Sequence, residues 1–203
     1  MSDYVGCDAH KKFSQIAVLD ETGQLRHEAK VVHDTRGAIR DYFTRFPEGT
    51  PVAVETVGNW YWIVDEIEAA GCEPRLTHAA KAKLMMGQTN KTDKLDAKGL
   101  AKLLRNGTLP QVWLAPRELR DERELPRTRM ALCKVRTALK NRVHSTLAKY
   151  AITIDKVSDI FGQEGRSLMM QAIQKLPPET RRCLEQHLEV LDEVQEQLDQ
   201  LEA

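Results

Sequence analysis

The pattern of apolar and polar positions divides the chain into a first part in which strands and helices alternate and a second part that is helical throughout. Three short apolar stretches separated by turn residues open the sequence and predict antiparallel strands. Short apolar strands and amphipathic helices then alternate. The predicted strands cover residues 4–9, 13–19, 25–32, 52–55 and 74–77, with an extended segment at 109–114. The predicted helices lie between residues 34 and 46, 59 and 71, 79 and 86, and 93 and 105, with Asp34 or Thr35 as the N-cap of the first and Asn59 as that of the second.

This order of elements predicts a mixed α/β fold. Three antiparallel strands followed by helix, strand, helix, strand and helix match the ribonuclease-H-like fold. In that fold the first strand lies in the middle of the sheet, and the strand at residues 52–55 lies beside it. We therefore expect a domain over residues 1–115 with a mixed sheet flanked by helices, and an all-helical segment over residues 116–203.

The helical segment has two parts that differ in character. A basic amphipathic helix is predicted over residues 127–150, and a further helix near residues 166–175. Because the sequence ends with a leucine seam still open, it predicts the start of a coiled coil whose partner helix comes from elsewhere, and hence a homodimer or higher homo-oligomer. The leucines at coiled-coil spacing, all after Pro177-Pro178, are Leu184, Leu188, Leu191, Leu198 and Leu201.

With 41% hydrophobic and 30% charged residues, the 203-residue chain has the composition of a soluble globular protein. No apolar run approaches the length that spans a membrane, and the N-terminus lacks the basic and apolar regions of a signal peptide. We therefore expect a cytoplasmic protein with no membrane partner. The cysteines include no Cys-x-x-Cys pair, which argues against a zinc site or a disulfide framework and predicts reduced, mostly buried thiols. They are Cys7, Cys72, Cys133 and Cys183.

The formal net charge of zero hides an uneven distribution of charge along the chain. The basic helix contains no acid, whereas the final helix from Cys183 onward contains acids and no Lys or Arg. Such a basic surface suits the phosphate backbone of a nucleic acid. Alternatively, these bases belong to a solvated helix that pairs with acids such as those of the final helix. The candidate nucleic-acid-binding residues are Arg127, Arg129, Lys134, Arg136, Lys140 and Arg142.

Four acids form a candidate metal site. Asp93 and Asp96 lie three residues apart behind the predicted N-cap Thr92, so they share a helix face that continues into a leucine stripe. Asp8 lies near the end of the first strand and Glu55 ends an apolar strand, so the fold would bring these two together. A cage of carboxylates suits Mg²⁺ or Mn²⁺, and two such ions can assist phosphoryl transfer. Each acid also has an ordinary interpretation, such as a first-turn acid of a helix for Asp93 and Asp96.

Other side chains near these acids allow two interpretations. His10 could position phosphate or metal, although a surface histidine in a turn is the favoured interpretation. Trp60, Tyr61 and Trp62 could stack on bases, although packing is favoured for at least Trp62. Lysines around the acidic pair could hold DNA or be ordinary solvated side chains. They are Lys81, Lys83, Lys91, Lys94, Lys98 and Lys102.

The combination of these segments resembles the DEDD transposases of bacterial insertion sequences, relatives of the Piv-type DNA invertases with an N-terminal RuvC-like domain. The resemblance extends over essentially the whole chain and is carried by residues 5–11, 54–60, 90–97, 125–129, 158–162 and 176–178. It implies that the four metal-binding catalytic acids are Asp8, Glu55, Asp93 and Asp96. It also implies a recombinase that acts on DNA by metal-assisted phosphoryl transfer, works as an oligomer and is guided by a structured bridge RNA.

The chain departs from that family's pattern in one respect. Family members carry a second, C-terminal domain with helix-hairpin-helix character and a serine nucleophile. No serine of this sequence stands in a context that resembles that nucleophile; the serines are Ser2, Ser14, Ser145, Ser158 and Ser167. We therefore expect an N-terminal fragment that binds metal and nucleic acid but does not complete strand transfer alone.

Three alternatives remain open at the level of sequence. A stand-alone metal endonuclease resembling Holliday-junction resolvases would use water in place of serine and form no covalent protein–DNA adduct. An RNA-binding and assembly module without activity would bind RNA even with the Asp93→Asn substitution. An actin-like ATPase also opens with an Asp-bearing hairpin, but the sequence contains no glycine-rich phosphate loop.

Overall fold

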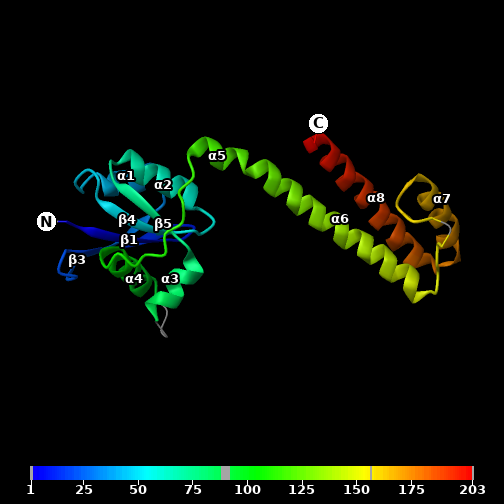
Figure 1. Cartoon of the computed structure of the whole chain (residues 1–203), viewed down its shortest axis with the longest axis horizontal. Helices are drawn as coiled ribbons and strands as arrows, with labels where there is room; N and C mark the ends of the chain where they lie inside the picture. The colour runs from blue at the N-terminus through cyan, green and yellow to red at the C-terminus, as the bar shows by residue number, and fades with distance from the viewer. Residues whose placement is uncertain (1, 88–91, 156, 203) are drawn as a thin grey trace. The chain divides into compact units, whose positions relative to one another are not determined.

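The computed structural model describes residues 2–87, 92–155 and 157–202. The chain forms two compact units, Met1–Leu114 and Ala115–Ala203, and each is described by itself. Figure 1 shows a sheet with helices in the first unit and helices alone in the second.

A five-stranded mixed sheet forms the centre of the first unit. Its strand order is β3-β2-β1-β4-β5, with β1 in the middle. The first three strands pair antiparallel, and β4 pairs parallel with both β1 and β5. This order confirms the predicted ribonuclease-H-like fold. The strand bounds are Tyr4–Ala9 for β1, Phe13–Leu19 for β2, Leu25–Val32 for β3, Pro51–Glu55 for β4 and Glu73–Thr77 for β5.

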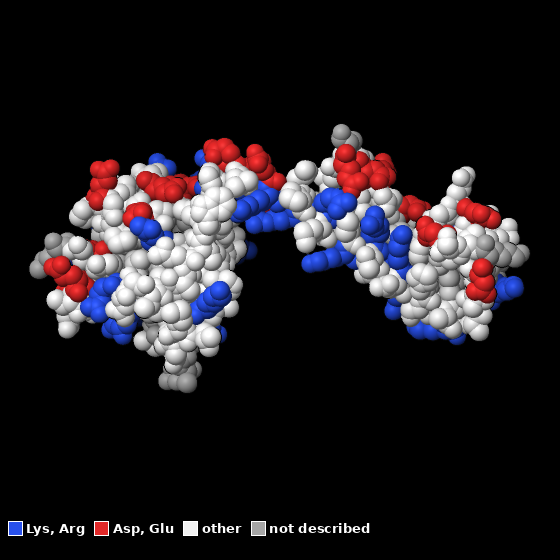
Figure 2. Space-filling model, in the orientation of Figure 1, with Lys and Arg blue, Asp and Glu red and all other residues white. Residues whose placement is uncertain are grey.

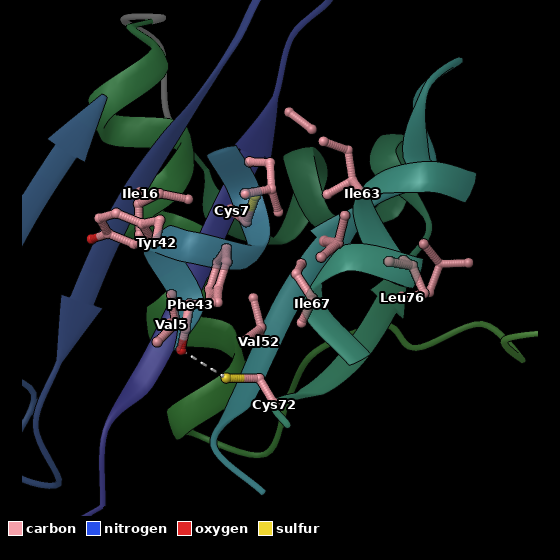
Figure 3. Close-up of a cluster of buried hydrophobic side chains, with 14 of the residues drawn as sticks. Val5, Cys7, Ile16, Tyr42, Phe43, Val52, Ile63, Ile67, Cys72 and Leu76 are labelled. Carbon is pink, nitrogen blue, oxygen red and sulfur yellow. Dashed lines mark hydrogen bonds between the residues drawn. The ribbon is translucent and has the colours of Figure 1, made fainter. Parts of the chain in front are cut away.

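Helices cover both faces of this sheet, as Figure 1 shows. On one face lie α1 (Gly37–Phe43) and α2 (Trp60–Ala69), and on the other lie α3 (Ala79–Met86) and α4 (Asp93–Arg105). The core beneath α1 and α2 contains alternate residues of β1 and β4 together with aliphatic and aromatic residues of the two helices. Figure 3 shows Val5, Cys7, Ile16, Phe43, Val52, Ile63 and Ile67 among them.

Two details of α1 and α2 differ from the sequence prediction. The predicted N-caps Asp34 and Thr35 are wrong, because α1 begins after Arg36 and ends at Phe43 instead of continuing to residue 46. Asn59 occupies the N-cap position of α2 but makes no side-chain cap bond. Its amide instead donates a hydrogen bond of 2.8 Å to the carbonyl oxygen of His10. Asn59 therefore serves the loop after β1 rather than its own helix.

Gly6 lets α4 lie directly against the central strand. A Cβ atom built at this position would lie 2.0 Å from the carbonyl oxygen of Ala97 and 2.7 Å from the amide nitrogen of Ala101. Both alanines are fully buried, as is Leu100 in the same helix. Residues without a side chain or with a single methyl group therefore set the distance between β1 and α4, and this contact determines where the start of α4 lies.

The second unit consists of helices alone. Its elements are α5 (Arg117–Glu122), α6 (Glu124–Lys149), α7 (Gln163–Ala172), the short 3-10 helix η1 (Ile173–Lys175) and α8 (Pro178–Glu202). Helices α6 and α8 run side by side in opposite directions (Figure 1), and the Arg129 side chain near the start of α6 pairs with Glu202 at the end of α8. Apolar residues of α6, α7, η1 and α8 form its core.

The leucine seam of the final helix is already covered within the chain. Leu184, Leu188, Leu191 and Leu198 are all buried, because α8 packs lengthwise against α6. The prediction that a partner helix must come from elsewhere to cover these leucines is therefore wrong. The sequence pattern identified the seam correctly but not its neighbour, because the spacing of leucines in one helix does not specify which helix packs against it. Oligomerisation itself stays a prediction.

The cysteines are reduced, as the sequence predicted, and two of the four are buried. All four cysteines are free, with Cys7 and Cys72 buried, Cys133 half-buried and Cys183 exposed. Burial raises the pKa of the Cys7 thiol to about 12, so this group stays protonated. No helix in the described part of the chain combines the length and the apolar character that a membrane span requires.

Candidate active site

Asp8 lies near the end of the central strand, on the face covered by α4. Side chains alternate between the two faces of a strand, so Asp8 shares its face with Gly6, against which α4 packs. The residue between them, Cys7, belongs to the opposite core. Asp8 is only 6% exposed. A carboxylate at such a position needs a partner, because an unpaired buried charge is costly.

Glu55 lies at the corresponding end of the neighbouring strand. Because β4 is parallel to β1 and Val54 is paired with Cys7, the next residues along the two strands are Glu55 and Asp8. Both carboxylates thus lie where the two strands end. Glu55 is half-buried and makes an interaction within the chain.

Helix α4 supplies the other two acids from its first turn. Asp93 is its first residue and Asp96 its fourth, and both are half-buried. Thr92 is the N-cap, as predicted, and its hydroxyl accepts a hydrogen bond of 3.3 Å from the Leu95 amide. The helix dipole favours negative charge at this end. Asn90 and Lys91, which belong to the same sequence motif, lie outside the described residues.

A pocket of about 360 Å³ lies between these elements. Three of the predicted acids line it: Asp8 from β1, Glu55 from β4 and Asp96 from α4. Lys83 of α3 also lines it and is exposed, so one positive charge lies beside the carboxylates. The remaining lining residues are His10 and the apolar Ala9, Val57, Ala79, Ala80 and Met86.

His10 connects Asp8 to the fourth acid, Asp93. Its Nε2 atom lies 3.0 Å from Oδ2 of Asp8 and 3.4 Å from Oδ1 of Asp93. His10 lies in the predicted turn between β1 and β2, but its side chain is only 35% exposed and contacts the acids. The sequence interpretation of His10 as a surface residue is therefore wrong. The spacing Asp8-x-His10 was the available signal, since residues two apart in extended chain lie on the same side.

Burial raises the pKa of Asp8, and the like charges of Asp96 and Asp93 add to this rise. The charge of His10 and its hydrogen bond oppose the rise, but the net shift is upward. This combination of desolvation and repulsion disfavours the ionised form when no cation is present. The environment of Asp8 therefore favours a bound cation, which would remove much of the repulsion.

The donor atoms present fit a divalent metal ion. One ligand atom each from Asp8, His10 and Asp93 lies within 4.8 Å of the others. Carboxylate oxygens suit hard cations such as Mg²⁺, and an imidazole nitrogen suits transition metals. Asp96 and Glu55 do not belong to this close group, but they share the pocket with Asp8. The structure thus brings Asp8, Glu55 and Asp96 to one pocket. It places Asp93 against His10, which also lines that pocket.

The candidate nucleic-acid-binding residues lie on α6 and differ in how they are partnered. Arg127 pairs with Glu124 at 2.6 Å, Arg129 pairs with Glu202 at 2.6 Å, and Arg136 donates to Oε1 of Gln195 at 3.0 Å. The Lys140 ammonium lies 4.7 Å from the centre of the Phe161 ring. Lys134 and Arg142 are exposed and form no ion pair with any residue of the described ranges.

Figure 2 shows Lys and Arg side chains gathered along the second unit and Asp and Glu side chains gathered near the end of α8. The alternative in which basic residues pair with acids of the final helix therefore describes Arg129. It does not describe Lys134 or Arg142. Among the aromatic candidates, Trp60 and Trp62 pack against the core beneath α2, so the favoured packing role of Trp62 is confirmed.

A mixed sheet with the strand order β3-β2-β1-β4-β5, and with acids where β1 and β4 end, is the arrangement of the ribonuclease-H-like class of proteins. Within that class, the chain belongs to the DEDD transposase family of the IS110 type. The profile of this family, described as transposase, matches residues 5–152.

The structure of T. thermophilus RuvC in complex with Holliday junction substrate is similar to 55% of this chain and to 100% of its own chain, with 18% sequence identity and a TM-score of 0.40. No curated protein matches the chain significantly.

Proposed function

We propose that this transposase-family chain acts on DNA by divalent-metal-assisted phosphoryl transfer at the pocket between β1, β4 and α4. Asp8, Glu55, Asp93 and Asp96 are the proposed metal ligands and catalytic acids. The observation that carries this proposal is their convergence from three elements, together with the raised pKa of Asp8. Four acids so placed would repel one another without a counter-ion.

The side chains have distinct parts in this proposal. Asp8 is the most buried of the four and is held on the central strand, so it fixes the position of the site. Asp93 and Asp96 approach from the first turn of α4, and Lys83 offers a positive charge to a DNA phosphate at the pocket. When bound, divalent ions activate the attacking nucleophile and stabilise the leaving oxygen. Mg²⁺ and Mn²⁺ are the proposed ions.

Metal binding should therefore raise the thermal stability of the chain. At a metal concentration 100 times the dissociation constant, binding to the folded state alone contributes about 2.7 kcal/mol. We expect the melting temperature to rise with added Mn²⁺ or Mg²⁺, and Asp96→Asn to reduce the rise. Differential scanning calorimetry measures both. Glu193→Gln, an exposed acid of α8, is the control and should leave the rise unchanged. Equal rises in Asp96→Asn and the wild type would argue against a role for Asp96.

We also propose that the exposed bases of α6 bind the phosphate backbone of nucleic acid. The support comes from Lys134 and Arg142, which are exposed and form no ion pair with any described residue. Arg142 also lines a pocket of about 270 Å³ whose charged lining residues are Lys149 and Glu179 besides Arg142 itself. Phosphate contacts of this kind carry no sequence information. Guidance by a structured RNA, with base pairing rather than protein contacts reading the DNA, is the accompanying proposal and comes from the family resemblance.

Replacing both Lys134 and Arg142 with glutamine should weaken nucleic-acid binding and make it less sensitive to salt. Each phosphate contact contributes about 0.9 to the slope of log affinity against log salt, so the slope should fall by about 2. Fluorescence anisotropy with duplex DNA over a salt series measures it. The control is Lys175→Gln, an exposed base of the same unit outside α6. An unchanged slope in the double variant would show that these two residues do not contact phosphate.

Homo-oligomerisation stays part of the proposal but needs a different surface from the one predicted. Since four of the leucines of α8 are already buried against α6, a second copy would have to contact other side chains. Leu125, Met130 and Val135 of α6 are exposed apolar residues that could take part.

A further inference from the structure

We infer that His10 is itself a metal ligand, so that the site is a mixed nitrogen and oxygen site rather than one made of carboxylates alone. The inference rests on the proposed metal-binding function of the pocket. It goes beyond that function because the four acids account for all of the ligands predicted from the sequence. The sequence favoured a surface histidine in a turn at His10 and offered a role in positioning phosphate or metal only as the less favoured interpretation.

The first argument is the position of the Nε2 atom. It lies within hydrogen-bonding range of Asp8 and close to Asp93, at 3.0 and 3.4 Å. The ligand atoms of His10, Asp8 and Asp93 lie within 4.8 Å of one another, which is compact enough for a single ion. Nitrogen Nε2 therefore lies near one oxygen of each of these two carboxylates. A histidine binds metal through a ring nitrogen without a proton, and Nε2 is the nitrogen that faces these acids.

The second argument is that the ring is held in place by its own contacts. The His10 amide donates a hydrogen bond of 2.8 Å to the carbonyl oxygen of Phe13, and the His10 carbonyl accepts one of 2.8 Å from Asn59. The imidazole also stacks on the Phe13 ring, with 4.6 Å between the ring centres and 29° between the planes. Backbone and ring contacts thus fix the imidazole before an ion binds. A ligand whose position is set by its surroundings is ordered before the ion binds.

The consequence concerns the choice of ion. Carboxylate and water ligands suit Mg²⁺ and Mn²⁺ alike, whereas an imidazole ligand favours the transition metal. With His10 as a ligand, Mn²⁺ should bind more tightly than Mg²⁺. Replacing His10 with glutamine should weaken Mn²⁺ binding by roughly tenfold or more, the order of effect seen when groups around a metal are removed. Binding of Mg²⁺ should change less.

Pulsed electron paramagnetic resonance of bound Mn²⁺ tests the inference without any activity measurement. The full chain loaded with Mn²⁺ should show electron spin echo modulation from a directly bound imidazole ¹⁴N. The modulation should change to the ¹⁵N pattern in wild-type protein labelled with [¹⁵N]histidine, which requires no substitution. It should disappear in His10→Gln. His78→Asn is the matched control, because His78 precedes the pocket-lining Ala79, caps α3, and is replaced by another good N-cap residue.

The outcomes separate the inference from the function on which it rests. Bound Mn²⁺ without nitrogen modulation, or modulation that persists in His10→Gln, would overturn the role of His10 and leave the acidic site standing. Absence of Mn²⁺ binding by the wild type would overturn the proposed function and the inference together. Modulation that disappears in His10→Gln and persists in His78→Asn would establish His10 as the ligand.

Discussion

Asp8→Asn should remove metal-dependent DNA cleavage and the thermal stabilisation by Mn²⁺, while the chain still folds. Asp8 is the most buried of the four acids and lies on the central strand, so none of the others can take its place. The loss of metal affinity should exceed the ~10–100-fold that follows removal of a group outside the ligand shell. Calorimetry with and without Mn²⁺, together with cleavage of labelled DNA, measures both effects.

The same substitution should raise the stability of the metal-free chain at neutral pH. The pKa of Asp8 is raised in the folded state, mainly by burial. The folded chain therefore binds more protons than the unfolded chain between the ordinary and the raised pKa, and stability falls as pH rises through that window. Above the window, ionised Asp8 is destabilising, and asparagine removes this effect. Below the ordinary pKa of 3.8, the wild-type and variant chains should converge in stability.

Asp34→Asn is the control for both measurements. Asp34 is exposed, and its side chain accepts a hydrogen bond only from the adjacent Thr35 amide among the bonds described. Its replacement should affect neither the response to Mn²⁺ nor the pH dependence just described. Metal-dependent cleavage by Asp8→Asn at the wild-type rate would contradict the proposed site. A variant that is less stable than the wild type at neutral pH without metal would contradict the destabilising role of ionised Asp8.

Gly6→Ala should strongly destabilise the first unit. The added Cβ would lie 2.0 Å from the backbone of Ala97, so α4 or β1 would have to move. Overpacking of a core costs ~1–3 kcal/mol, and a clash with backbone rather than a flexible side chain places this case at the upper end or above. Since the movement shifts α4 relative to β1, it should also separate Asp96 and Asp93 from Asp8 and weaken metal binding.

Gly58→Ala provides a matched control for this prediction. Gly58 is exposed, and a Cβ atom there would have no heavy atom within 4 Å among its non-adjacent neighbours. Urea denaturation of both variants gives the change in the free energy of unfolding, and Mn²⁺ titration gives the change in affinity. If Gly6→Ala were as stable as Gly58→Ala, α4 would not be held against β1 as closely as the structure describes.

The sequence was sufficient for the sheet because its signals are local. Turn residues at Asp20 and Gly23 separate two apolar stretches, and a continuous apolar run at residues 52–54 predicts a buried strand. The order of these elements then leaves few arrangements. The grouping of the acids could be predicted from this topology. The ends of the first and fourth strands and the start of the helix at residue 93 were expected at the same edge of the sheet, and each carries a carboxylate.

The parts that could not be predicted depend on contacts between distant residues. The position of His10 beside the acids depends in part on Asn59, which is far away in sequence but donates to the His10 carbonyl. The sequence alone therefore offered no ground for preferring this position over a surface turn. Likewise, nothing in the leucine spacing of α8 shows that α6 covers it, because a seam is compatible with any apolar helix of suitable length. The start of α1 was misplaced because Asp34 and Thr35 are both good N-cap residues, yet neither caps the helix.

The acids of the proposed site lie on elements that differ in local stability. Strands paired along both edges open only when much of the sheet opens, so the Asp8 carboxylate keeps its place during small fluctuations of the fold. Asp93 and Asp96 belong to the first turn of a helix, the part that frays most readily. If a metal ion binds as proposed, we expect its release to depend on the first turn of α4 more than on β1.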